Sequence, residues 1–161
     1  MEKEDKPTLE QKEVFKTSFK KATEKDVESF LELEKAVANN KLYSSFKEED
    51  EILEEFKNAE VYLMYKGDRV IGSTAFQMKS PDHAYLAGLV VHPDFQGQGL
   101  AREAALFRLE KLQGIKRIDV VTHPDNFKII GLYESLGFKI EKQIENYYGD
   151  GEPRVMLVKE G

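Results

Sequence analysis

The spacing of hydrophobic side chains predicts one strand and two helices in the first third of the chain. Residues 14–22 suit a strand, and Thr23 with Asp26 resembles a capping box that opens a helix ending near residues 39–40. Residues 45–58 predict a second, strongly acidic helix with Ser45 as its cap and a solvent-facing side. The apolar positions are Val27, Phe30, Leu31 and Val37 in the first helix and Ile52, Leu53 and Phe56 in the second.

From residue 61 onward the pattern is mainly that of strands separated by two helices. Residues 61–65 and 69–78 flank a glycine-bearing turn and predict a hairpin, and residues 84–91 form a third apolar run. Residues 100–112 have helical spacing, residues 117–122 suit a buried strand, and residues 126–136 predict a helix ended by Gly137. Strands near 139–146 and 154–159 close the chain around a turn-rich segment.

This order of elements, β α α β β β α β α β β, predicts an α+β sandwich. Its sheet is expected to be mixed and mostly antiparallel, with six to seven strands and helices on both faces. The strand ending at Val91, the helix after Gly99 and the strand from Arg117 form one central parallel βαβ unit, which places a ligand edge at the carboxyl end of the first strand. We expect residues 16–161 to form a single domain and residues 1–15 a lead-in arm.

Composition narrows the class of partner. Among 161 residues, 30 are acidic and 24 basic, and the net charge of −6 argues against nucleic acid and mildly favours cationic partners. The longest apolar run is too short to span a membrane, and the charged start does not suit a secretory signal. Since cysteine is absent, we expect a cytoplasmic protein without a thiolate nucleophile. A monomer and a homodimer are both compatible with the sequence.

A glycine-bearing loop, Gln96 to Ala101, precedes the helix of the βαβ unit. Unpaired amides of a first helical turn attract phosphate oxygens, and glycines let those oxygens approach the backbone. A P-loop is excluded because no lysine follows Gly99 until Lys111. A Rossmann fingerprint fails because Arg102 stands where glycine or alanine is needed. An ordinary helix-entry turn is the alternative explanation of these glycines.

The loop resembles the pyrophosphate-binding motif of the GCN5-related N-acetyltransferases (GNAT), [QR]-x-x-G-x-[GA]. The family's preceding strand end, V-x-P, and its second block, an asparagine followed by a tyrosine and then L-G-F, are also present at the right distances. The resemblance extends from about Phe19 to Val158 and implies a GNAT fold, acetyl-CoA as co-substrate and acetyl transfer to an amine. The matching residues are Gln96, Gly99 and Ala101 in the loop, Val91 and Pro93 at the strand end, and Asn126, Tyr133, Leu136, Gly137 and Phe138 in the second block.

The resemblance also implies a role for each matching position. Backbone groups of residues 89–91 would pair with the pantetheine arm, the loop amides would hold the diphosphate, and Asn126 would hydrogen-bond the cofactor. Tyr133 would lie near the thioester sulfur, where a phenol can protonate the departing thiolate. From spacing alone, Tyr133 also suits a core aromatic residue and Asn126 a helix N-cap. The implied cofactor contacts are Leu89, Val90, Val91, Gln96, Gly97, Gln98, Gly99, Leu100, Ala101, Arg102 and Asn126.

The group that accepts a proton from the amine is left unassigned. Ribosomal-protein N-terminal acetyltransferases tend to have a glutamate where this chain has Val121. Tyr85 is a candidate for a catalytic role, with a half-buried strand tyrosine as the alternative. His123 could titrate near neutral pH, although a loop histidine is more often a solvated surface group.

The acceptor is expected to be a primary amine, either a peptide N-terminus or a small molecule. Tyr147 and Tyr148 resemble a peptide-contacting tyrosine pair in N-terminal amine acetyltransferases, although such hairpin tips also occur without a ligand. The acidic run 47–55 is expected to be solvated, with guidance of a cationic acceptor as the alternative. Tyr43 and Phe46 lie in the segment that flanks the acceptor site in the family.

Two other functions are alternatives to acetyl transfer, and the histidines of the chain do not suggest a metal site. A non-catalytic acyl-CoA-binding module stays open because Val121 and Tyr85 stand at two positions where the family commonly has a glutamate, and a transferase of longer acyl groups is a weaker option. No metal is expected, because His83, His92 and His123 lack helical ligand spacing.

Overall fold

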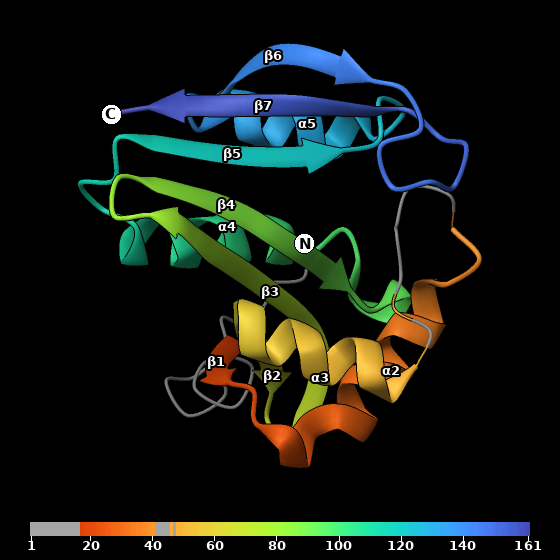
Figure 1. The fold of residues 1–161 in the computed structure, drawn as a ribbon. Coiled ribbons are helices and arrows are strands. Elements are labelled where there is room, and N and C mark those ends of the chain that lie inside the picture. Colours follow the sequence, from red (N-terminus) through yellow and green to blue (C-terminus); the bar gives the residue numbers. More distant parts are fainter. Residues whose placement is uncertain (1–16, 41–45, 47) are drawn as a thin grey trace, which may run out of the picture.

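The computed structural model describes residues 17–40, 46 and 48–161, in which seven strands form one sheet (Figure 1). The strands follow the order β1-β2-β3-β4-β5-β7-β6, and β4 pairs with β5 in parallel while the other neighbours are antiparallel. The predicted α+β class, mixed sheet and parallel βαβ unit are therefore confirmed. The strands are β1 Thr17–Lys21, β2 Glu60–Lys66, β3 Arg69–Ser80, β4 His83–Val91, β5 Arg117–Thr122, β6 Lys139–Ile144 and β7 Arg154–Glu160.

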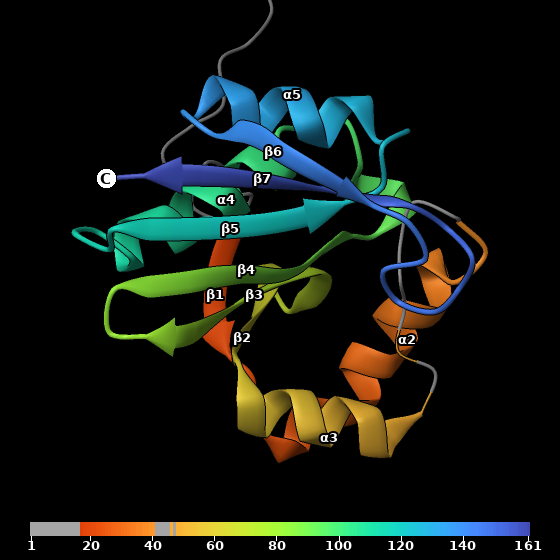
Figure 2. The same cartoon turned by 45° about the horizontal axis from the view of Figure 1, so that its top comes forward.

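Four α-helices cover both faces of the sheet (Figures 1 and 2). On one face, α2 and α3 pack against Val61, Leu63 and Ala75. On the other face, α4 and α5 pack against Tyr62, Phe76 and Leu86. The alternation of neighbouring strand residues between the two clusters follows from the two-residue period of a strand. The helices are α2 Val27–Val37, α3 Glu49–Asn58, α4 Leu100–Lys111 and α5 Phe127–Ser135, and none within the described ranges could span a membrane.

The ends of several elements differ from their predicted positions. The Thr23–Asp26 capping box is present, but it caps the start of a short 3-10 turn over Glu24–Asp26 that precedes α2. The acidic helix α3 begins at Glu49, and Ser45, its predicted cap, lies outside the described residues, as do residues 1–15 and Tyr43. At the outer edge of the sheet, β6 stops at Ile144 because its ladder with β7 begins at Arg154, so the last two predicted residues form a turn.

A bulge in β4 determines where the sheet opens. The β3–β4 register passes from Phe76↔Leu86 to Thr74↔Leu89, so that β4 contains one extra residue around Gly88. The parallel ladder to β5 ends next to this bulge, at Leu86↔Val120, although β4 continues to Val91. The two arrowheads diverge in Figure 1. The last five residues of β4 consequently present a strand edge that β5 does not pair with.

Candidate active site

A cavity of about 400 Å³ lies where β4 and β5 separate. It is lined from both faces of the sheet, by α2 and α3 on one side and by α4 and α5 on the other. Two ligands can therefore reach the gap from opposite faces. Its lining is Glu34, Phe46, Glu51, Glu55, Gln77, Tyr85, Ala87, Gly88, Leu89, Val90, Val91, Ala101, Val120, Val121, Thr122, Asn126, Ile129, Tyr133, Tyr148 and Arg154.

Many of the residues predicted from the sequence meet in this cavity, whereas the glycine loop lies next to it. Tyr85, Tyr133 and Asn126 line the cavity together with the end of β4 and Ala101 of the first turn of α4. Leu100 is buried against the core, so only its backbone can serve a ligand. The remaining loop positions, Gln96, Gly97, Gln98, Gly99 and Arg102, are exposed and do not line the cavity.

The loop has the geometry of an anion cradle. Gly97 and Gly99 have φ of +81° and +79°, the left-handed region that glycine adopts without strain, and a Cβ at either would have no protein atom within 4 Å. The Gln96 side chain donates to the carbonyl of Val91 over 3.0 Å, which ties the loop to the end of β4. Backbone amides at the start of α4 are thus open to a ligand that carries negative charge.

Basic side chains surround this cradle. Lys66 donates to the side chain of Gln98 over 3.2 Å, and both Lys66 and Arg69 lie over the ring of Phe95. Arg102 in the first turn of α4 donates to the hydroxyl of Ser135 over 3.4 Å. Arg69 also pairs with Asp94 over 3.4 Å. The protein is acidic overall, so the positive charges of Lys66 and Arg102 here are a local feature that favours a phosphate-bearing ligand.

Tyr133 is at once a core residue and a cavity residue, so the two alternatives left by the sequence do not exclude each other. Its side chain is 1% exposed and packs edge-on against Phe138. Its hydroxyl accepts a hydrogen bond of 2.5 Å from Arg108. Asn126 occupies the N-cap position of α5 but its side chain makes no capping bond; it donates to Thr122 over 3.5 Å and faces the cavity.

Tyr85 lies on the opposite side of the gap, toward Glu55 of α3. Its hydroxyl shares a hydrogen bond of 3.2 Å with that of Tyr148. Burial raises the pKa of both phenols, and for Tyr85 the neighbouring Tyr148 adds to the effect. Tyr85 therefore remains protonated at neutral pH and can orient a ligand or a water by hydrogen bonding.

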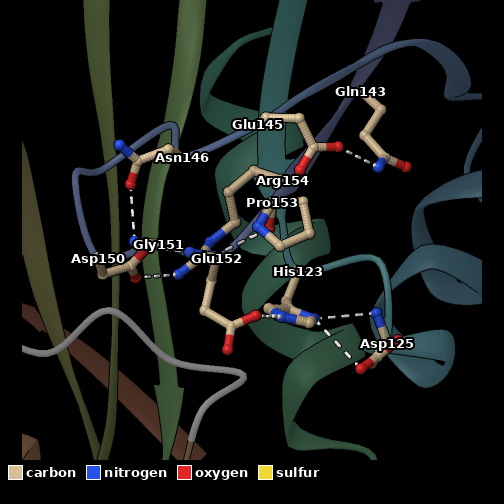
Figure 3. A network of polar contacts seen from close by, with 10 residues as sticks. All are labelled: His123, Asp125, Gln143, Glu145, Asn146, Asp150, Gly151, Glu152, Pro153 and Arg154. Atoms are coloured by element: carbon tan, nitrogen blue, oxygen red, sulfur yellow. Dashed lines mark hydrogen bonds and ion pairs between the residues drawn. The ribbon is translucent and has the colours of Figure 1, made fainter.

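The β6–β7 loop lines the cavity with Tyr148. His123, which follows β5, and Arg154, the first residue of β7, both contact this loop (Figure 3). His123 is 2% exposed, so the expectation of a solvated surface histidine is wrong. The amide of Asp125 donates to its Nδ1, which leaves Nε2 to donate to Glu152 over 2.9 Å. Buried Arg154 donates to Asp150 over 2.8 Å and lies over the ring of Tyr148. These contacts hold Tyr148 against Tyr85.

Three carboxylates line the cavity from α2 and α3: Glu34, Glu51 and Glu55. Glu34 was not predicted from the sequence, whereas Glu51 and Glu55 belong to the acidic run for which guidance of a cationic acceptor was the alternative. Burial raises the pKa of Glu55, and the charge of Lys79 partly opposes this. The four-residue spacing of Glu51 and Glu55 on α3 was the available signal, since it places both on one helix face. Glu34 accepts from the amide of Phe46 over 3.3 Å. In the described part of the chain, no three histidines, aspartates or glutamates are grouped to hold a metal ion.

Comparison with known proteins assigns the family. The sequence profile described as "Acetyltransferase (GNAT) family" matches residues 19–138, most of the chain. The chain belongs to the GNAT acetyltransferase family. Among curated relatives, this GNAT chain is 39% identical over 64 residues to an acetyltransferase of Yersinia enterocolitica, and the match covers 38% of this chain but only 43% of that relative.

Solved GNAT structures have the same fold. The ribosomal-protein-S18-alanine N-acetyltransferase of Escherichia coli is 21% identical, with a TM-score of 0.76 over 90% of this chain and 94% of its own. A GNAT acetyltransferase of Elizabethkingia anophelis, solved with acetyl-CoA bound, is 16% identical, with a TM-score of 0.71 over 90% of this chain and 98% of its own. At these identities the likeness shows the fold.

Proposed function

We propose that this protein transfers an acetyl group from acetyl-CoA to a primary amine by direct attack in a ternary complex. The observation that carries the proposal is the cavity in the gap between β4 and β5, where an open strand edge, a helix start and a buried phenol converge. The resemblance of the loop and of the Asn126–Phe138 block to GNAT motifs supports the same conclusion.

The cofactor is proposed to enter from the face that carries α4 and α5. Its diphosphate would meet the amides of residues 97–102, with Lys66 and Arg102 supplying charge. Its amide-bearing arm would add to the edge of β4 at Leu89 and Val91, which β5 leaves without a ladder. Asn126 would donate to the same arm. The thioester then lies in the gap near Tyr133.

Bound acetyl-CoA supplies an acetyl carbon that a neutral amine can attack. A bond forms from the amine nitrogen to that carbon, and the carbon–sulfur bond breaks with its electron pair remaining on sulfur. Tyr133 is proposed to donate its hydroxyl proton to that sulfur. The nitrogen loses one proton to water in the cavity as the amide forms, and that water returns a proton to the phenolate, so that the net products are the amide and the CoA thiol. Because the phenol is next to a buried guanidinium, the transient negative charge is compensated.

The acceptor amine is proposed to enter from the face that carries α2 and α3. There, Glu55 would attract the ammonium form and accept the proton lost before attack, since a carboxylate whose pKa is raised is a stronger base. Tyr85 and Tyr148 would orient the amine. Two acceptors suit this end: a peptide N-terminus, which aromatic side chains and hydroxyls can hold, and a polyamine, which carboxylates attract.

Release of CoA thiol is the measurement that tests the proposal. Purified protein is mixed with acetyl-CoA and either a peptide with N-terminal alanine, spermidine, an aminoglycoside or an amino acid. We expect acceptor-dependent thiol release with at least one primary amine and none when its amino group is already acetylated. Tight CoA binding by calorimetry without thiol release for any acceptor would instead favour the non-catalytic acyl-CoA-binding module. Release with longer acyl-CoA alone would assign a different acyl donor.

A further inference from the structure

Arg108 of α4 is a fully buried guanidinium on the face of the helix that packs against the sheet. Within the described residues no carboxylate forms an ion pair with it, and its Nε has no hydrogen-bond partner. Burying a cation without a counter-ion is strongly unfavourable unless its remaining protons are well bonded. Three oxygen atoms accept hydrogen bonds from the guanidinium, namely the carbonyls of Ala75 and Ala87 and the hydroxyl of Tyr133. Ala87 and Tyr133 line the candidate active site.

Two of these acceptors are the backbone carbonyls at the β4 bulge. Nη1 donates to the carbonyl of Ala75 over 3.3 Å and to that of Ala87 over 3.5 Å. Ala75 and Ala87 fall inside the interval where the β3–β4 register shifts, so neither has a partner residue in that ladder. The guanidinium thus ties α4 to the point at which β4 leaves β5.

The third acceptor is the hydroxyl of Tyr133, which receives a hydrogen bond from Nη2. A phenolic oxygen has one proton to donate and lone pairs that accept. Since Arg108 can only donate, the phenolic proton cannot point toward it. Among the described residues no acceptor takes that proton, while Tyr133 lines the cavity. The contact therefore leaves the proton available on the cavity side.

We propose that Arg108 is a positioning residue for the acid step. It fixes the phenol of Tyr133 relative to the β4 edge, directs the hydroxyl proton toward the departing sulfur, and stabilises the phenolate after the proton has moved. This inference rests on the proposed function and assigns a role to a residue that has no place in the resemblance to the family. Atoms balance as in the transfer already described, because Arg108 keeps all its protons.

A double-mutant cycle between Arg108 and Tyr133 tests this proposal. Arg108→Met, Arg108→Lys, Tyr133→Phe and the two double variants are compared with the wild type. Turnover is followed as CoA thiol release from acetyl-CoA, with the alanine-terminated peptide or spermidine, whichever the wild type acetylates faster. Calorimetric CoA affinity and thermal midpoint are measured for each variant.

We expect Tyr133→Phe and Arg108→Met each to lower kcat by about tenfold or more, as for loss of a positioned acid, with CoA affinity kept within about threefold. In the Tyr133→Phe background, the Arg108 substitutions should change kcat by no more than about twofold, because the group through which Arg108 acts is gone. Arg108→Lys should be intermediate, since it keeps the charge but not the paired donors.

Other outcomes overturn the inference in distinguishable ways. Multiplicative losses in the double variants, or full turnover in Arg108→Met, would show that Arg108 does not act through Tyr133. An equal loss of CoA affinity and of kcat would show that Arg108 only maintains the β4 bulge and does not position Tyr133. Should Arg108→Met not fold, Arg108→Lys completes the same cycle. Absence of thiol release in the wild type with the peptide, spermidine, the aminoglycoside and the amino acid would instead overturn the proposed function itself.

Discussion

Replacing Gly99 by alanine separates backbone strain from ligand binding. Gly99 has φ of +79°, and a Cβ there would have no protein atom within 4 Å. An alanine in the left-handed region costs about 1 kcal/mol of folding free energy, which lowers Tm by about 2–4 °C in a chain of this size. Gly114, just beyond the other end of α4, has φ of +83° and equally open surroundings, so Gly114→Ala is a matched control.

The two variants should differ only in cofactor binding. A methyl group at Gly99 occupies the space through which an oxygen of the diphosphate would reach the amides of the first turn. Losing one charge-assisted hydrogen bond costs about 1.5–3 kcal/mol, or a tenfold to hundredfold weaker CoA affinity by calorimetry. Gly114→Ala should bind CoA like the wild type with a similar loss of Tm. Wild-type affinity in Gly99→Ala, or an equal loss in Gly114→Ala, would refute the assignment of the loop.

Three further substitutions test the acceptor side and the charge at the cradle. Glu55→Gln should lower kcat/KM for the amine and abolish the fall in activity as pH drops through the raised pKa of Glu55, and an unaltered pH–rate profile would exclude Glu55 as the base. The same substitution should raise Tm at pH 7, where burial penalises the charged carboxylate, and leave Tm unchanged at a pH low enough to protonate that carboxyl. Tyr148→Phe removes the hydrogen bond to Tyr85 and should raise KM for the amine severalfold with CoA affinity unchanged; equal effects on both ligands would place Tyr148 elsewhere in the reaction. Lys66→Met should weaken CoA binding more at low salt than at high salt, and salt-independent affinity in both proteins would remove Lys66 from the cradle.

Local sequence rules determined the order of elements and the frame of the site. The elements follow from the capping residues Thr23 and Asp26, from the turn glycines, and from the helical and strand spacing of the apolar residues. The structure confirms their order. The two glycines of the loop and the Asn126–Tyr133 spacing could be recognised because each depends on residues close together in the chain. Conformations such as a positive φ, or two side chains on one helix face, are decided within about two turns.

The tertiary structure alone decided which distant segments of the chain come into contact. The charge of Arg108 predicts a surface residue, yet packing of α4 against the β3–β4 bulge buries it beside Tyr133, 25 residues away in the chain. His123 is buried because the β6–β7 loop supplies Glu152, and Tyr85 meets Tyr148 across 63 residues. No pattern in one segment encodes such a partner. The sheet topology determines which distant segments come together. A cation or a phenol can be buried there only if a group from such a segment satisfies its hydrogen bonds.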